Sequence, residues 1–176
     1  MIKKVVMLIA SNRFRDEELF KTMEVLESKG VNVTVASKKT GILSGALGGT
    51  VTVTMNYKDV SVNNFDAIVF VGGQGASEYF NDEHAKKLAT DFFNRGRVVA
   101  AICIAPSILA NAGLLKGRQA TCHASESYNL RGKGVEYMNE NVVVDGRLIT
   151  AKGPQCSEEF GAEIARALGA VKPTIV

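Results

Sequence analysis

Cys103 lies at a point in this sequence where a reactive side chain would be easy to present. The five apolar residues before it, Val98–Ile102, indicate a strand buried on both faces. The segment after it has Pro106 where a first helical turn tolerates proline, and it ends at Asn111, ahead of a stop at Gly113. Cys103 is therefore predicted to occupy a sharp strand-to-helix turn, which would lift its side chain above a sheet.

The chemistry that such a turn favours is that of an activated thiol. Ala101 and Ala105, two positions on either side of the cysteine, are small enough for the turn. Free N–H groups at the start of the following helix favour an anion, so we expect the pKa of the Cys103 thiol to be lowered and the thiolate to be reactive. The alternative is a buried cysteine that only fills space. The turn alone does not separate the two interpretations.

A thiolate also needs polar neighbours, and the sequence offers two kinds. Glu17 and Glu18 open a predicted helix whose start faces the same edge of the sheet. A carboxyl pointing inward there would have a raised pKa, and it could hydrogen-bond a thiolate when neutral or accept a proton when ionised. The alternative is that both acids only complement the helix dipole. His123, which follows a short strand, is either a base for Cys103 or a histidine bonded to the backbone.

The elements that must position these groups alternate along the chain. Buried strands are predicted at 5–10, 31–36, 66–71 and 98–102, and further helices at 16–29, 82–94 and 157–168. This alternation is typical of right-handed βαβ units in an α/β sandwich, with a mostly parallel sheet and helices on both faces. Ligands of such sheets bind at the carboxyl ends of the strands. Gly72-Gly73, directly after a strand, falls at the same edge as Cys103 and lets the backbone approach a ligand closely.

Three stretches depart from this alternation. Glycines and an alternating apolar pattern between 37 and 56 predict a small β-excursion. Asp145-Gly146 predicts a hairpin that joins strands 141–144 and 147–151. Residues 125–130 fit either a helix or an irregular segment.

Composition limits the classes of function. With 176 residues, 46% hydrophobic and 22% charged, the chain fits one domain, residues 1–176, with a core that needs no disulfide or metal. The net charge of +3, without Lys/Arg clusters beyond short pairs, gives no support for a nucleic-acid partner. No apolar run approaches the roughly 18 residues of a membrane span, so we expect no membrane partner. Three cysteines without a secretory pattern favour a reducing, cytoplasmic location.

A metal site is a weak alternative. Cys103, Cys122, His123 and Cys156 are soft ligands, but adjacent Cys122-His123 is not the usual ligand spacing and no C-x-x-C occurs. We therefore expect no metal and no other cofactor, with Cys122 and Cys156 as packing thiols. Lys152 could help to hold an anionic substrate, although a surface lysine is the commoner explanation.

Four segments together resemble the ThiJ/PfpI family, whose members include protein deglycases, PfpI-type intracellular peptidases and glutathione-independent glyoxalases. The resemblance runs in order from Lys3 to Leu168. The segments that carry it are Phe14-Arg-Asp-Glu-Glu-Leu19, Val71-Gly-Gly73, Ala101-Ile-Cys-Ile-Ala-Pro106 and Lys152-Gly-Pro154. It implies a flavodoxin-like three-layer sandwich that is usually a homodimer.

The resemblance also implies roles for individual residues. Cys103 matches the family's nucleophilic cysteine, and Glu18 matches the carboxyl that contacts it. The backbone N–H groups of Gly73 and Ile104 match an oxyanion hole, which the turn at Cys103 indicates independently. His123 falls where deglycase-like members carry a histidine close to the cysteine. PfpI-type peptidases have a histidine directly after the cysteine, and Ile104 cannot act as a base, which disfavours proteolysis.

The leading hypothesis is a cofactor-independent cysteine enzyme that acts on small reactive carbonyl compounds. The Cys103 thiolate would add to an aldehyde such as methylglyoxal, Glu18 or His123 would move the proton, and water would release a hydroxy acid. The alternative from another class is a non-catalytic redox sensor or chaperone-like stress protein, because a thiol of low pKa beside a neutral carboxyl oxidises readily. A PfpI-type peptidase is the third hypothesis.

Overall fold

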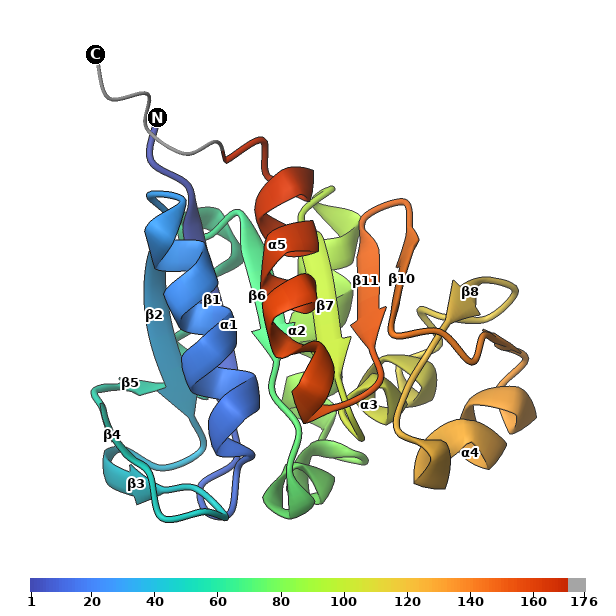
Figure 1. Ribbon diagram of the computed structural model, residues 1–176, viewed down its shortest axis with the longest axis horizontal. Coiled ribbons are helices and arrows are strands. Elements are labelled where there is room, and N and C mark those ends of the chain that lie inside the picture. Colours follow the sequence, from blue (N-terminus) through green and yellow to red (C-terminus); the bar gives the residue numbers. More distant parts are fainter. Residues whose placement is uncertain (171–176) are drawn as a thin grey trace.

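The structure, a computed structural model, describes residues 1–170 and is built on a seven-stranded sheet in the order β10-β11-β7-β6-β1-β2-β5 (Figure 1). Its strands are β1 (Lys4–Ile9), β2 (Asn32–Ser37), β5 (Met55–Asn56), β6 (Ala67–Phe70), β7 (Val98–Ile102), β10 (Val142–Asp145) and β11 (Leu148–Ala151). All neighbouring pairs are parallel except the β10–β11 hairpin. The mostly parallel sheet and the hairpin that the sequence predicts are thus confirmed.

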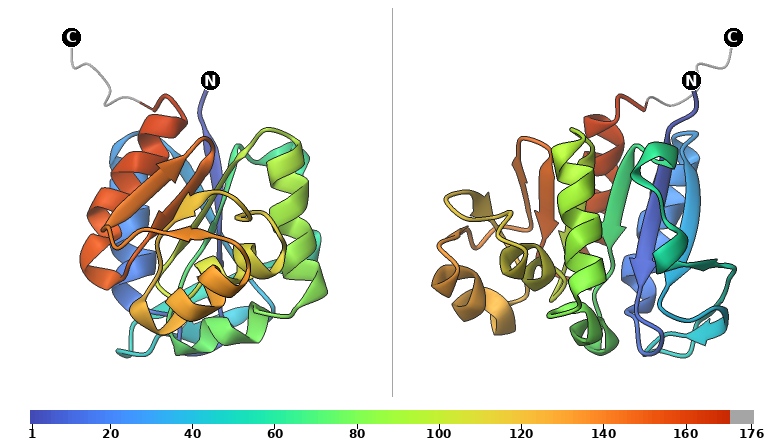
Figure 2. Two further views of the ribbon diagram at one scale, coloured as in Figure 1. Left: turned by 90° about the vertical axis from the view of Figure 1, so that its right-hand side faces the viewer. Right: turned by 180° about the vertical axis from the view of Figure 1, so that it is seen from behind.

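Helices cover both faces of this sheet, as Figures 1 and 2 show from opposite sides. They are α1 (Asp16–Ser28) and α5 (Ser157–Ala167) on one face, and α2 (Glu83–Asn94) and α3 (Pro106–Asn111) on the other. The buried residues form two clusters, one on each face: Leu26 and Phe160 belong to the first, Phe92 and Ile108 to the second. The predicted three-layer α/β sandwich is therefore confirmed, because apolar stripes on both helix pairs need a sheet that is buried on both faces.

Smaller elements lie outside the main sheet and its four covering helices. The predicted β-excursion is an antiparallel pair, β3 (Gly41–Ser44) and β4 (Thr50–Val53). A parallel pair, β8 (Gln119–Ala120) and β9 (Glu136–Tyr137), lies beside α4 (Ser127–Gly132), so residues 127–132 are helical. Short 3₁₀ turns complete the chain: η1 (Tyr57–Asp59), η2 (Val62–Asn64), η3 (Gln74–Tyr79), η4 (Ala124–Glu126) and η5 (Pro154–Cys156). No helix within residues 1–170 is long and apolar enough to cross a membrane.

One sheet position was not predictable from the order of the elements. The hairpin joins the sheet through its second strand, so that β11 lies between β10 and β7. All four residues of β11 are buried, whereas β10 exposes Val144. A strand buried on both faces belongs in the interior of a sheet, and the strand with an exposed side chain belongs at its edge.

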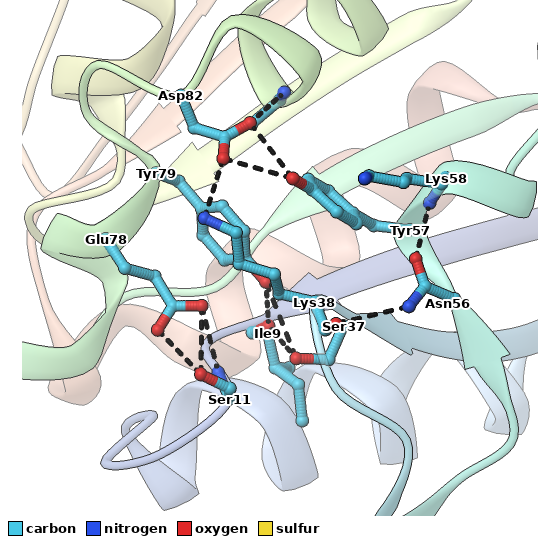
Figure 3. Close-up of polar contacts among 11 residues, drawn as sticks. Ile9, Ser11, Ser37, Lys38, Asn56, Tyr57, Lys58, Glu78, Tyr79 and Asp82 are labelled. Carbon is cyan, nitrogen blue, oxygen red and sulfur yellow. Dashed lines mark hydrogen bonds and ion pairs between the residues drawn. The ribbon is translucent and has the colours of Figure 1, made fainter.

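The carboxyl ends of the parallel strands meet at the lower edge in Figure 1, where polar contacts fasten the following loops. Figure 3 shows Tyr79 of η3 among them: its hydroxyl donates to the Ile9 carbonyl at 2.8 Å and accepts the Lys38 N–H at 3.0 Å. The Ser37 hydroxyl donates to the same Ile9 carbonyl at 2.7 Å. These bonds hold η3, which begins directly after Gly73, against the ends of β1 and β2.

Candidate active site

Cys103 lies at the turn between β7 and α3 that the sequence predicts. Its φ of 65° is in the left-handed region, which residues other than glycine rarely adopt. The backbone is held on both sides, because the Cys103 N–H donates to the Ala151 carbonyl at 2.9 Å and the Cys103 carbonyl accepts the His123 N–H at 2.7 Å. Such a conformation costs about 1–3 kcal/mol and persists only where its surroundings enforce it. It presents a thiol that is 8% exposed to a cavity.

Two glycines bring the loop after β6 against this thiol. A Cβ on Gly72 would lie 2.7 Å from Cβ of Cys103 and 2.7 Å from Oε1 of Glu18, so the side chains of Cys103 and Glu18 both lie against this glycine. Gly73 has a φ of 99°, and a Cβ there would collide with the backbone nitrogen of Arg15. The N–H groups of Gly73 and Ile104 donate toward the Cys103 sulfur. The structure thus brings together the two N–H donors that the sequence predicts.

Glu18 is the predicted acid that points inward. Its side chain is 0% exposed, and neither carboxyl oxygen has a hydrogen-bond partner among residues 1–170. Burial raises the pKa of Glu18 to about 8, while the polar thiol of Cys103 and the charge of Arg15 lower it. At pH 7 the carboxyl is therefore mostly neutral. Glu17, by contrast, pairs with Arg15, with 2.8 Å between Oε2 and Nε.

The thiol itself differs from the prediction. Burial, followed by the charge of Glu18, raises the pKa of Cys103 to about 12, and the N–H groups of Gly73 and Ile104 lower it by less. The predicted lowering of the thiol pKa is therefore wrong, because desolvation destabilises the thiolate more than the nearby N–H groups stabilise it. The repulsion from Glu18 disappears when that carboxyl is neutral, so the two groups gain and lose protons as a pair.

His123 lies at the rim of the cavity and is exposed. Its Nδ1 is 2.9 Å from the Ser125 hydroxyl and accepts the Ser125 N–H at 3.2 Å, which caps η4. Among residues 1–170, the ring makes no hydrogen bond to Cys103, and its Nε2 makes no hydrogen bond at all. The structure thus places His123 close to the predicted site without a hydrogen bond to the thiol.

The cavity that these residues share has a volume of about 460 Å³. It is lined by Arg13, Arg15, Ala46, Gly73, Gln74, Cys103, Ile104, His123, Ser125 and Pro154. Glu18 is fully buried and does not line the cavity. The sequence reasoning missed the two arginines, because basic residues in a polar loop look like solvated surface. The signal that could have found them is the Phe14–Leu19 segment that carries the family resemblance, because Arg15 lies within it and Arg13 directly precedes it.

The other candidates lie away from the thiol. Cys122 and Cys156 are buried and free, and they pack in the clusters on opposite faces of the sheet. Within residues 1–170 no three His, Cys, Asp or Glu side chains come together as a metal site requires, so the alternative of a soft metal site has no ligand cluster. Lys152 does not line the cavity, and its amine donates to Oδ1 of Asn139 at 2.6 Å.

Comparison with known proteins places this chain in a family. Residues 3–167 match the DJ-1/PfpI family. An uncharacterised protein from Methanocaldococcus jannaschii is 45% identical, over 94% of this chain and 82% of its own length. Deglycase PfpI of Pyrococcus furiosus is 34% identical, over 85% and 90%. Glutathione-independent glyoxalase DJR-1.2 of Caenorhabditis elegans is 30% identical, over 94% and 89%.

A solved structure agrees with these matches. The ThiJ/PfpI domain protein from Brachyspira murdochii superposes with a TM-score of 0.94 at 32% identity, covering 97% of this chain and 98% of that one. The flavodoxin-like fold implied by the resemblance is therefore confirmed. Since the family match spans nearly the whole sequence, and a relative 45% identical covers 94% of it, the chain belongs to the DJ-1/PfpI family.

Proposed function

We propose that this protein is a cofactor-independent cysteine enzyme that converts 2-oxoaldehydes into 2-hydroxy acids, a glutathione-independent glyoxalase with related deglycase activity. The observation that carries the proposal is a buried carboxyl, Glu18, whose polar neighbour is the thiol of Cys103 at a strained turn that opens into a cavity. The names of the relatives from Pyrococcus furiosus and Caenorhabditis elegans, a deglycase and a glyoxalase, support the same class of chemistry.

The first step is addition of sulfur to the aldehyde. Glu18 in its ionised form takes the proton of the Cys103 thiol, and the sulfur then attacks the aldehyde carbon to give a hemithioacetal. The N–H groups of Gly73 and Ile104, which face the sulfur beforehand, stabilise the negative charge as it moves to the substrate oxygen. Cys103 is thus the nucleophile, and the turn between β7 and α3 that carries it is a nucleophile elbow.

Glu18 next gives the thiol proton to the substrate oxygen, which completes the hemithioacetal and returns the carboxylate. The carboxylate then removes the proton from the former aldehyde carbon and returns it to the neighbouring carbon, while the hydroxyl proton moves to the former ketone oxygen. The aldehyde carbon is thereby oxidised, the ketone carbon is reduced and a thioester forms. Water then cleaves the thioester and releases the thiol and the 2-hydroxy acid. Methylglyoxal plus water gives lactic acid, so no external oxidant or reductant is needed. We assign to His123, whose Nε2 faces no partner within residues 1–170, a proton transfer to substrate at the rim.

Two alternative functions fit the site less well. A redox sensor needs a thiolate in the resting state, whereas burial and the raised pKa of Cys103 oppose one. An enzyme needs the thiolate only when Glu18 removes the proton beside a bound aldehyde. A PfpI-type peptidase would need a base directly after the cysteine, where this chain has Ile104.

The test is formation of lactate from methylglyoxal by purified protein. We expect Cys103→Ser to lose activity by at least about 10³-fold and Glu18→Gln by about 10²-fold or more, the range found for removing a nucleophile or a general base. Glu17→Gln, which removes the neighbouring acid that pairs with Arg15, is the matched control and should keep activity within about threefold. Absence of lactate at high enzyme loading, or a Cys103→Ser variant as active as the wild type, would overturn the proposal.

We further infer, from the family, that the enzyme acts as a homodimer in the cytoplasm and that its partner is a small carbonyl compound rather than nucleic acid or a membrane. Light scattering coupled to size-exclusion chromatography tests the oligomeric state directly. A mass of one chain, about 18.8 kDa, would contradict the dimer.

A further inference from the structure

We propose that Arg13 and Arg15 form an anion-binding subsite beside Cys103, and that the preferred substrates are carbonyl compounds that carry a carboxylate or a phosphate. The inference rests on the proposed function, because it names the substrate class of that same site. It concerns residues that the mechanism above does not use.

The first support is the charge of the cavity. Both arginines line it, and none of the lining residues within 1–170 is acidic. Arg15 uses only Nε in its contact with Glu17, and its two terminal NH₂ groups make no hydrogen bond within that range. Arg13 makes no side-chain hydrogen bond or ion pair with any described residue. Two guanidinium groups thus have donors available to a ligand, and guanidinium groups bind carboxylates and phosphates through paired hydrogen bonds.

The second support is the nearness of this charge to the reacting atoms. Arg15 lowers the pKa of Glu18, and the pKa of Arg15 is raised first by its hydrogen bond to Glu17 and, by less, by the charges of Glu18 and Cys103. The guanidinium therefore lies close enough to the thiol and the carboxyl for their charges to interact. A substrate could therefore place its anionic group at the arginines and its carbonyl group at the sulfur.

The third support is the rigidity of the loop that carries the arginines. The Arg15 N–H donates to the Gly72 carbonyl at 3.0 Å, and the Gly75 N–H donates to the Arg13 carbonyl at 3.1 Å. On the other side, the Arg13 N–H donates to the Ser44 carbonyl at 3.0 Å. These bonds hold Arg13 at a φ of 59°, a conformation that is costly for a side-chain-bearing residue. The loop is thus fastened to the same segment that supplies the Gly73 N–H, and a binding group on a rigid loop loses little entropy when a ligand binds.

The size of the cavity agrees with a substrate larger than methylglyoxal. At about 30 Å³ for each water molecule in the liquid, a cavity of about 460 Å³ has space for some fifteen water molecules. A three-carbon aldehyde would leave most of this space filled with water. An aldehyde with an anionic tail would occupy more of it and place the tail at the rim, where the arginines lie.

Arg13 is the decisive residue of the pair. The contact of Arg15 with Glu17 balances part of its charge, whereas Arg13 has no acidic partner within residues 1–170. We therefore expect Arg13→Gln to remove most of the preference for anions. Arg95→Gln is the matched control, because Arg95 is an exposed arginine at the end of α2 that makes no ion pair with a described residue.

The first experiment measures charge selectivity at the sulfur without turnover. Iodoacetate and iodoacetamide alkylate the same thiol and differ in carrying a carboxylate or a neutral amide. We expect the ratio of their rate constants at Cys103, followed by mass spectrometry at pH 8, to fall about tenfold in Arg13→Gln, which corresponds to about 1.4 kcal/mol, and to stay unchanged in Arg95→Gln. An unchanged ratio in Arg13→Gln would overturn the anion subsite.

The second experiment measures kcat/KM for three 2-oxoaldehydes. The substrates are methylglyoxal, 4,5-dioxopentanoate, which with water gives 2-hydroxyglutarate, and a phosphorylated three-carbon 2-oxoaldehyde. We expect wild type to prefer at least one anionic substrate over methylglyoxal by about tenfold or more, and the better one to identify the anion as carboxylate or phosphate. Arg13→Gln should lose this preference, measured as the ratio of kcat/KM between the anionic substrate and methylglyoxal, whereas Arg95→Gln should keep both this ratio and the rate with methylglyoxal. Preference for methylglyoxal over both anionic substrates would contradict the inference.

The two proposals fail in different ways. If wild type converts methylglyoxal but Arg13→Gln leaves charge selectivity intact, the function stands and the subsite is wrong. If no aldehyde is turned over and Cys103 resists both alkylating reagents, the proposed function fails. Calorimetric titration with inorganic phosphate then tests the subsite alone: binding to wild type that Arg13→Gln weakens about tenfold supports it, and equal binding or none refutes it.

Discussion

Replacing Glu18 by glutamine should change the stability of this protein in a way that depends on pH. Below about pH 4.5 the carboxyl is protonated in both the folded and the unfolded chain. As the pH rises, the unfolded chain releases the proton, whereas burial keeps it on Glu18 until the pKa of about 8. The free energy of unfolding of the wild type therefore falls as the pH rises from 4.5 to 8. Above pH 8 both states have lost it and the effect levels off.

The size of the effect follows from that interval. Each pH unit between 4.5 and about 8 lowers the free energy of unfolding of the wild type by about 1.4 kcal/mol. The wild type should therefore lose about 5 kcal/mol relative to Glu18→Gln across the interval. A glutamine amide brings its own unsatisfied donors, but this cost does not vary with pH.

The assay is urea unfolding of both proteins between pH 5 and pH 8. The quantity to compare is the difference between their free energies of unfolding at each pH, which should shift in favour of Glu18→Gln by several kcal/mol as the pH rises. Glu17→Gln controls for the loss of an acid from the first turn of α1. Repeating the comparison with Cys103→Ser in both proteins excludes a contribution from the thiol. A difference that stays constant within about 1 kcal/mol would show that burial does not keep Glu18 neutral.

Three further predictions concern the surroundings of the pair. Gly72→Ala would place a methyl carbon 2.7 Å from both Cβ of Cys103 and Oε1 of Glu18, so the rate of Cys103 alkylation should change at least tenfold and the free energy of unfolding should fall by about 1–3 kcal/mol. The control in both measurements is Gly132→Ala, whose methyl group would meet no atom within 4 Å. Because burial raises the pKa of Cys103 to about 12, the alkylation rate by iodoacetamide should keep rising with pH from 7 to 9; a plateau below pH 8, seen by mass spectrometry, would contradict this. Tyr79→Phe removes a buried hydroxyl that makes hydrogen bonds of 2.8 and 3.0 Å, so urea unfolding should report a loss of about 1–3 kcal/mol; a change below about 0.5 kcal/mol would mean that these bonds do not fasten η3.

The elements of this fold were predictable because they depend on local sequence patterns. The apolar run Val98–Ile102 and the Asp145-Gly146 turn appear in the structure as β7 and as the β10–β11 hairpin. The position of Cys103 also followed from local pattern, since a strand, a single residue and a helix with an early proline specify a sharp turn. The motifs around it were sufficient for the family resemblance.

Local pattern did not determine which side chains lose water. Glu17 and Glu18 are adjacent acids in one helical turn, and only the packing of α1 against the sheet buries one and leaves the other with Arg15. The thiol pKa was predicted in the wrong direction for the same reason, because a helix start is visible in the sequence and the burial of Cys103 is not.

The sequence by itself determined the strands, the helices, the turn at Cys103 and the family. The tertiary structure decided that Glu18 meets this thiol, that His123 stays at the rim, and that Arg13 and Arg15 line the cavity beside it. The physical reason is that secondary structure depends on neighbours along the chain, whereas desolvation and charge at a site are sums over segments far apart in sequence. Here the ends of β1, β6 and β7 and the loop before η4 supply those segments.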